Sequence, residues 1–182
     1  MLNILLWLLL AISAVSATGI VPTVPTIESS IVNRLLQLDL GLRATALLLD
    51  SLDEEGANIT VADVITSYGK TTAPGPNTIQ QLFSSPCDET TQFVLCHVYH
   101  TFALTSISLY TDLAEGSSDF TRDHRNGLQE GFARFYMENA FFVDTVAPTG
   151  VPLCRESIQY DDWALHKAFM IAFNALTPMT VK

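Results

Sequence analysis

The segment ESSIVNRLLQLDLGLRATALLLDSLDEE (residues 28–55) carries the clearest structural signal in the sequence. Its apolar residues recur at steps of three and four: Ile31, Leu35, Leu38, Leu42, Leu49 and Leu52. This period places them on one side of an α-helix. Ser29 and Ser30 suit the start of that helix, and Gly56 suits its end. The segment therefore predicts one long amphipathic helix over residues 28–55.

Three further long helices are expected, over residues 88–115, 118–146 and 155–176. Gly116 can end the first of them. The second has an apolar stripe formed by Leu128, Phe132, Phe135, Phe142 and Val146. The third has one formed by Leu165, Phe169, Ala172, Phe173 and Leu176.

Shorter elements lie between these helices. Thr60 stands three residues before Asp63, close to a capping box, and predicts a short helix over residues 60–69. A second short helix is expected over residues 78–85. Apolar residues hardly ever alternate with polar ones, so strands are not expected. The sequence predicts an all-α protein. Its residues 28–182 form one domain, an antiparallel bundle of about four long helices plus one or two short helices, with one disulfide.

The first residues, MLNILLWLLLAISAVSA (1–17), are uncharged and apolar and end in small residues. This pattern predicts a signal peptide cleaved after Ala17. A spanning helix needs about 20 apolar residues, more than this stretch supplies, so no stable membrane anchor is expected. Residues 18–27 contain two prolines and read as an extended lead-in. The protein is expected to be secreted into the extracellular space.

The net charge of −10 limits the classes of partner. A nucleic-acid backbone would be repelled, because no basic stripe offsets the acidic field. Docking to anionic lipid is disfavoured for the same reason. Asn58-Ile59-Thr60 is an acceptor triplet for N-glycosylation in a polar connection, so Asn58 is expected to carry a glycan.

Three cysteines in an oxidising compartment predict one disulfide and one free thiol. Cys87 precedes the helix over residues 88–115, and Cys154 precedes the last helix. An antiparallel helix between them brings both to the same end of the bundle. Cys96 lies nine residues further along its helix, about 13 Å away at 1.5 Å per residue. The disulfide Cys87–Cys154 is therefore favoured. Cys96–Cys154 is the second choice, and Cys87–Cys96 is the third.

The stretch FVLCHVYHTF (residues 93–102) contains a cysteine and two histidines. A helical wheel places His97 on a polar face and His100 on an apolar face with Phe93, Cys96, Leu104 and Ile107. A metal pair and a Cys96 nucleophile with His100 as its base are both conceivable. The interpretation we favour is a buried free Cys96 beside a buried, hydrogen-bonded His100.

Polar residues on other helices are candidate partners for His100. Asn139 stands within an apolar stripe, where an unpaired amide is unfavourable, so it is expected to contact His100. Asp162 and His166 are neighbours at positions i and i+4 near another apolar stripe. His100, Asn139, Cys96, Asp162 and His166 are thus the candidate ligand-binding residues. A polar network that only fixes the helix register is the competing interpretation.

Catalytic motifs are missing from the sequence. It contains no G-x-S-x-G, H-E-x-x-H, C-x-x-C or phosphate-binding loop, so no catalytic residue, metal site or cofactor is assigned. The leading hypothesis is a secreted, non-enzymatic bundle that binds a protein partner or self-associates, as in a homodimer. Met137 and Phe141, on an otherwise polar helix side, would form its surface. The alternatives are an extracellular carrier of a small apolar ligand or lipid, and a small hydrolase or metal-binding protein that uses His100.

Overall fold

The computed structural model describes residues 26–54, 58–75, 78–79 and 81–177. This part of the chain contains helices and no strand, which confirms the all-α prediction. The four long helices are α2 (Ile27–Asp50), α4 (Glu89–Glu115), α5 (Arg122–Phe141) and α7 (Arg155–Leu176). The shorter helices are α3 (Val61–Thr72) and α6 (Ala147–Gly150). Single turns follow several of them: η1 (Ser51–Asp53), η2 (Gly116–Asp119), η3 (Phe142–Val146) and η4 (Pro152–Cys154).

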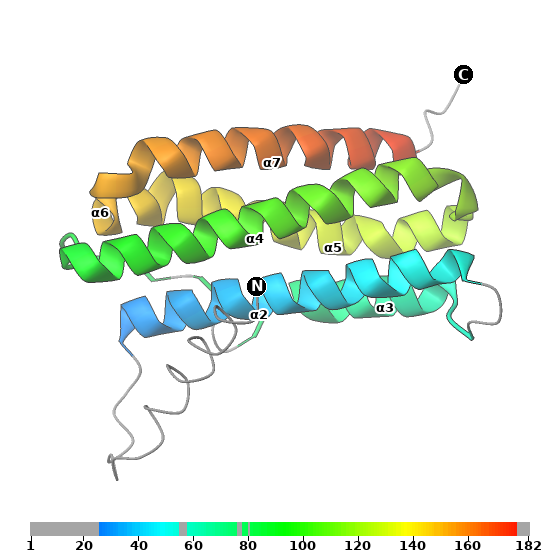
Figure 1. Ribbon diagram of the computed structural model, residues 1–182, viewed down its shortest axis with the longest axis horizontal. Helices are drawn as coiled ribbons and strands as arrows, with labels where there is room; N and C mark the ends of the chain where they lie inside the picture. The colour runs from blue at the N-terminus through cyan, green and yellow to red at the C-terminus, as the bar shows by residue number, and fades with distance from the viewer. Residues whose placement is uncertain (1–25, 55–57, 76–77, 80, 178–182) are drawn as a thin grey trace, which may run out of the picture.

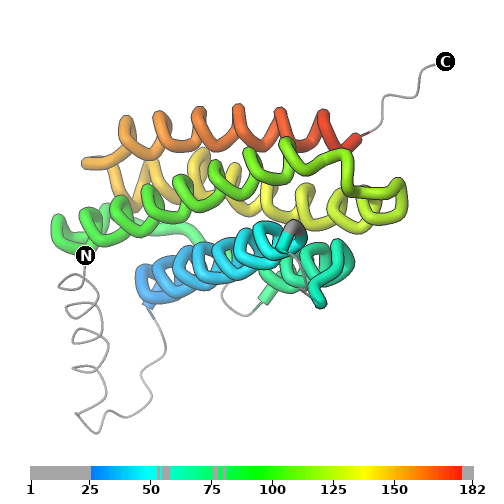
Figure 2. The backbone as a smooth tube through the Cα atoms, turned by 45° about the vertical axis from the view of Figure 1, so that its right-hand side comes forward, coloured from blue at the N-terminus to red at the C-terminus, as the bar shows by residue number. Residues whose placement is uncertain are grey.

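The helices form a bundle in which α2, α4 and α7 run in one direction and α3 and α5 run in the other (Figure 1). Helix α4 packs against α2 on one side and α7 on the other, and α3 packs against α2 and α5. With 12 residues, α3 is half as long as the 24-residue α2. The chain then returns to the start of α4 through residues 73–88, here called the 73–88 connection (Figure 2).

Side-chain caps define most helix starts. Thr60 and Asp63 form a capping box at α3, as the sequence predicts. Thr26 caps α2 and Asp88 caps α4 through the same kind of backbone contact. The prediction of a short helix over residues 78–85 is wrong, because the described residues there, 78–79 and 81–85, have irregular backbone. The expected signal peptide (1–17) lies outside the described residues, as does most of the lead-in.

Aromatic rings fill the centre of the bundle. Tyr110 of α4 contacts the rings of Phe132, Phe135 and Phe169, all at edge-to-face angles. Such rings bury large apolar areas, and this geometry suits their quadrupoles. The hydroxyls of Tyr110 and Tyr68 lie 2.7 Å apart and satisfy each other in the interior.

Helix α3 approaches its two neighbours at glycines. A Cβ atom at Gly41 of α2 would lie 2.4 Å from Thr71 Oγ1, and one at Gly131 of α5 would lie 2.6 Å from the Tyr68 ring. Both distances are shorter than a van der Waals contact. The absence of a side chain at these two positions therefore allows α3 to pack closely against both helices.

Helix α4 is unusually apolar. Among the described residues, Glu89–Asp119 is the one helical segment long and apolar enough to cross a membrane, with a mean hydropathy of 1.2 over its most apolar window. Length and composition alone are weak evidence, since core helices of soluble bundles meet the same criterion. In this bundle, 39 % of that window is buried against other helices.

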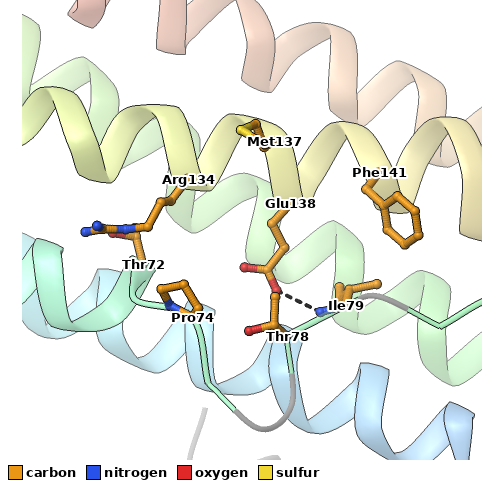
Figure 3. A pocket seen from close by; sticks show the side chains of 8 residues that line it. All are labelled: Thr72, Pro74, Thr78, Ile79, Arg134, Met137, Glu138 and Phe141. Atoms are coloured by element: carbon orange, nitrogen blue, oxygen red, sulfur yellow. Dashed lines mark hydrogen bonds between the residues drawn. The ribbon is translucent and has the colours of Figure 1, made fainter.

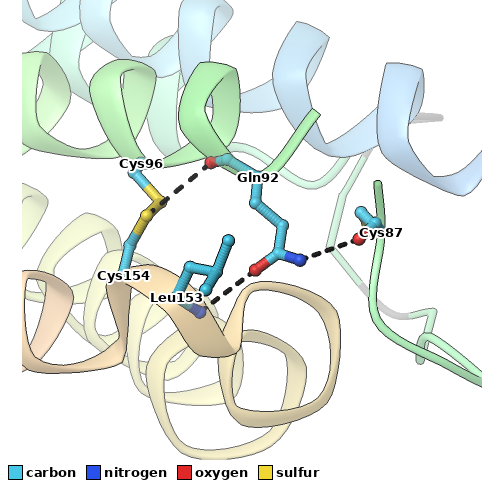
Figure 4. Close-up of a disulfide and its surroundings, with 5 residues drawn as sticks. All are labelled: Cys87, Gln92, Cys96, Leu153 and Cys154. Atoms are coloured by element: carbon cyan, nitrogen blue, oxygen red, sulfur yellow. Dashed lines mark hydrogen bonds between the residues drawn. A yellow bond between two sulfur atoms is a disulfide. The ribbon is translucent and has the colours of Figure 1, made fainter. Parts of the chain in front are cut away.

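The disulfide joins Cys96 of α4 to Cys154, with their Cα atoms 6.0 Å apart (Figure 4). The favoured prediction, Cys87–Cys154, is therefore wrong, and the second choice is the observed bond. The reason is that α5 continues through η3 and α6, so that the chain turns back only at Gly150. The Cys87 N–H donates to the Gly150 carbonyl at 3.0 Å, and Cys154 lies further along, beside Gln92 and Cys96.

The α4–α7 seam around the disulfide is held by Gln92. Its Nε2 donates to the Cys87 carbonyl at 2.7 Å, and its Oε1 accepts from the Leu153 N–H at 3.1 Å (Figure 4). One buried side chain thus ties the end of the 73–88 connection to the turn before α7. The two bonds satisfy an amide that would otherwise be unfavourable in the interior.

Candidate binding pocket

The candidate site is a surface pocket between α5 and the 73–88 connection (Figure 3). Its volume is about 370 Å³. The lining is mainly apolar, and two side chains of α5, Arg134 and Glu138, contribute charged groups. The lining residues are Thr72, Pro74, Thr78, Ile79, Arg134, Met137, Glu138 and Phe141. Small-molecule and side-chain pockets commonly have this size and this mixture of apolar walls with few polar groups.

One of the residues that line the pocket, Glu138, belongs to a buried ion pair. Glu138 of α5 accepts from Arg34 of α2 at both oxygens, each at 2.7 Å. Its Oε1 also accepts from the Ile79 N–H at 3.1 Å (Figure 3). The side chains of the pair are 5 % and 9 % exposed, so the charges are compensated by each other and not by water. Bidentate geometry is what makes such a buried pair tolerable.

Arg34 also fixes the C-terminal end of α3. Its Nη1 donates to the Thr71 carbonyl at 3.5 Å and its Nη2 to the Ala73 carbonyl at 3.4 Å. These carbonyls lie at the helix end, where intrahelical partners run out. The ion pair therefore connects α2 and α5 to the C-terminal end of α3 and to Ile79, which lie on either side of Pro74 in the sequence.

Arg134 borders the pocket one turn before Glu138. One of its Nη atoms pairs with Glu130, and the other donates to the Gly69 carbonyl at 3.5 Å. Within the described residues, its Nε is buried and has no hydrogen-bond partner. A buried donor without a partner is unfavourable, and this one is not exposed to a group in the pocket. The arrangement therefore offers a bound group mainly apolar contact.

Met137 and Phe141, the surface predicted from the sequence, both line this pocket. Met137 is 71 % exposed at the rim, and Phe141 is half-buried against the core. They lie one turn apart on α5, and the Phe141 ring extends from the helix toward Ile79 of the 73–88 connection (Figure 3). The structure thus adds a wall, formed by Pro74 and Ile79, that the helical pattern of α5 alone could not show.

The candidate ligand residues lie elsewhere, between α4, α5 and α7, and they do not form one cluster. His100 is exposed, and its Nδ1 lies 2.9 Å from Asp161 Oδ2. The predictions of a buried His100 and of an Asn139 contact are therefore wrong. Phe93 and Leu104, which the wheel placed on the core face with His100, are 58 % and 53 % exposed. The core face of α4 instead contains Leu95, Tyr99 and Phe102.

Asn139 bridges two other side chains. Its Oδ1 accepts from the Tyr99 hydroxyl at 3.1 Å, and its Nδ2 donates to Asp162 Oδ1 at 2.6 Å. Burial raises the pKa of Asp162, the Asn139 bond opposes this, and Asp144 adds to it. Burial also raises the pKa of Tyr99, which stays protonated as a donor. The chain Tyr99–Asn139–Asp162 fixes the relative register of α4, α5 and α7.

The remaining candidates are also separate. His97 is exposed on α4, as expected, and the His166 ring lies beside Tyr136, with ring centroids 5.7 Å apart. Cys96 is not a free thiol but half of the disulfide. Across the part of the chain that the structure describes, no group of three or more His, Cys, Asp or Glu side chains is arranged to hold a metal ion.

The free thiol belongs to Cys87, which is half-buried at the end of the 73–88 connection. Burial, followed by the nearby charges of Glu28 and Asp88, raises its pKa. Raised thiol pKa values disfavour the nucleophilic thiolate. Asn58 is exposed just before α3, so the structure leaves room for a glycan there.

Comparison with protein-family models, with curated proteins and with solved structures finds no match to this chain.

The residues that sequence reasoning missed are Arg34 and Glu138. Arg34 lies within the apolar stripe of residues 28–55, between Ile31 and Leu35. A charge on the buried side of a helix requires a partner, and this was the available signal. Glu138 gave no comparable signal, because α5 has charged residues on several sides.

Proposed function

We propose that this protein is a secreted, non-enzymatic binding protein, and that the pocket beside Met137 and Phe141 holds an apolar group of a protein partner. The observation that carries the proposal is the pocket itself, with about 370 Å³ of space and a mainly apolar wall fixed by the Arg34–Glu138 pair. Exposed apolar side chains next to a preformed pocket are typical of protein interaction sites.

The position of the pocket favours a protein partner over an enclosed ligand. Met137 is 71 % exposed, so it remains available to a surface that covers the pocket. The space beside Asn139 in the bundle interior amounts to about 10 Å³, too little for a lipid or another small ligand. His100 and Asn139, the proposed contacts of an internal ligand, have different partners.

Catalysis has less support. His100 and Asp161 resemble the base and orienting acid of a hydrolase triad. A triad also needs a nucleophile on the other ring nitrogen, and no serine or threonine hydroxyl of the described residues makes that bond. The His100–Asp161 pair is therefore better explained as a link between α4 and α7.

The test has two stages. Met137 is replaced by the photo-crosslinking residue benzoylphenylalanine, and the protein is irradiated in its own secretory fluid; the same replacement at Trp163, an exposed residue of α7, is the control. The protein crosslinked from position 137 is then purified and titrated against the unlabelled chain by calorimetry. Met137→Glu and Phe141→Ala should each weaken binding by about tenfold or more.

Equal crosslinking from positions 137 and 163 would contradict the proposal, as would unchanged affinity in both pocket variants. Native mass spectrometry of the secreted protein distinguishes the alternative. A small apolar molecule retained by the wild type and lost in Phe141→Ala would assign the pocket to a carrier function.

A further inference from the structure

The outward sides of α2 and α4 carry a second set of exposed apolar residues, none of which lines the pocket. It comprises exposed large apolar residues of both helices and is called here the α2–α4 face: Leu36, Leu40, Leu47, Phe93, Val94 and Leu104. Leu40 is 65 % and Leu104 is 53 % exposed. The two helices lie side by side in both views of the backbone (Figures 1 and 2).

A hydrogen bond across the α2–α4 seam fixes how the two helices lie against each other. The Thr105 hydroxyl donates to Asp39 Oδ1 at 2.5 Å. Leu40 follows Asp39 and Leu104 precedes Thr105, and both are exposed. Each of these two leucines is therefore one residue away from the contact and faces solvent.

The central stretches of α2 and α4 that contain this face have no net charge. Residues 90–111 of α4 contain no Asp, Glu, Lys or Arg, although they include the exposed His97 and His100. On α2, residues 35–49 contain only Asp39 and Arg43, which form an ion pair at 2.9 Å with Asp39 buried. The α2–α4 face thus has few ionisable groups in a chain of net charge −10.

The charge distribution favours a second copy of the chain as the occupant of this face. Other exposed surfaces carry acidic side chains, such as Asp123 and Glu130 on α5, Asp144 on η3 and Glu156 on α7. Two copies that met through those surfaces would bring like charges together, which is unfavourable. The neutral α2–α4 face allows two copies to approach without that repulsion and to remove apolar side chains from water.

The spacing on α4 is also self-complementary. Phe93 and Leu104 are separated by eleven residues, or about three helical turns and 16 Å, and both are exposed. When two α4 helices pack antiparallel about a two-fold axis near residue 98, Phe93 of one copy meets Leu104 of the other. The same contact then occurs twice, as an isologous interface requires. We propose that the α2–α4 face binds a second copy of this chain and forms a homodimer.

The test is sedimentation velocity on the secreted protein over a concentration series, after Cys87 has been capped with iodoacetamide to exclude a disulfide-linked dimer. The wild type should sediment as a dimer. Leu40→Glu and Leu104→Glu should each raise the dimer dissociation constant by about tenfold or more, because each places a carboxylate in the contact. Trp163→Glu, at an exposed apolar position of α7, should leave it unchanged.

Circular dichroism and thermal unfolding identify any variant that fails to fold, and Leu47→Gln provides a milder second variant at a position 67 % exposed. A monomeric wild type at every concentration would overturn the proposal, as would a dimer that survives both glutamate substitutions. A monomer that co-sediments with phosphatidylcholine vesicles, and loses this on Leu104→Glu, would assign the face to a lipid surface instead.

Discussion

Arg34 and Glu138 form a bidentate ion pair inside the bundle, with both N–O distances at 2.7 Å. The two residues are 104 positions apart in sequence and join α2 to α5, and they bind backbone groups of Thr71, Ala73 and Ile79. The pocket is therefore built on a polar contact and not only on apolar packing.

Removing one partner of this pair should destabilise the protein strongly. Arg34→Met leaves the Glu138 carboxylate buried without its counter-ion, which typically costs about 3–5 kcal/mol of unfolding free energy. Arg34→Met with Glu138→Leu should recover a large part of that loss, since neither charge remains. Chemical denaturation of the two single variants and the double variant measures the coupling. Additive losses in the double variant would show that the pair does not act as a unit.

The disulfide of the purified protein is expected to be Cys96–Cys154, with Cys87 as the free thiol. Peptide mapping without reduction, after alkylation, should find the label on Cys87. The bond joins residues 58 apart in sequence. Replacing both by Ala should lower the unfolding free energy by about 4 kcal/mol on the loop-entropy model. Label on Cys96 would contradict this connectivity.

Asp162 should make stability depend on pH. Burial raises its pKa above the ordinary value of 3.8, so the folded state retains this proton more tightly than the unfolded state. The resulting loss of stability is absent below pH 3.8, grows as the pH rises to the raised pKa, and is complete at neutral pH. Asp162→Asn should therefore unfold at a higher temperature than the wild type at pH 7.

The same substitution should have little effect at pH 3, where the wild-type carboxyl is already neutral and the Asn139 contact can persist. Thermal melts of both proteins across this pH range provide the measurement. A difference in Tm that stays constant with pH would exclude Asp162 as the source.

Asn58 should carry an N-linked glycan when the chain is secreted by a eukaryotic cell. Its side chain is exposed, and Thr60 supplies the required hydroxyl residue two positions later. Peptide-N-glycosidase should reduce the mass of the wild type, and Asn58→Gln should have the reduced mass from the start. An unchanged wild-type mass would show that the triplet is not used.

The regular helices could be predicted from sequence because periodicity and caps agree there. Ile31, Leu35 and Leu38 fix the buried side of α2, and Thr60 with Asp63 fixes the start of α3. The end of α4 at Gly116 follows the same logic.

Helix α4 misled the wheel, because it is apolar on nearly all sides. Phe93 and Leu104 are exposed, whereas the polar Gln92 and Ser106 are buried. Both buried groups are satisfied by backbone groups, Ser106 by the Phe102 carbonyl one turn earlier and Gln92 by Cys87 and the distant Leu153. The sequence pattern does not reveal such hydrogen bonds. The predicted rotation of α4 about its axis was therefore wrong, and so was the predicted contact between His100 and Asn139.

The pocket could not be predicted from the sequence, because its shape depends on contacts between residues far apart in the chain. Met137 and Phe141 stood out on α5, but their opposite wall comes from an irregular connection whose path follows from the Arg34–Glu138 pair. The disulfide depended on a turn at Gly150 that periodicity does not encode. In each case the missing information was where the chain reverses, and not which residues are helical.

Gln92 bears on how the protein acquires its native cystine. The three cysteines of the reduced chain can form any of three disulfides. The native pairing is compatible with the two hydrogen bonds that the Gln92 side-chain amide makes to the backbone of Cys87 and Leu153. A Cys87–Cys154 bond would require the Cys87 backbone to leave its place opposite Gly150. We infer that noncovalent docking of the α7 start on α4 favours the Cys96–Cys154 pairing over the other two.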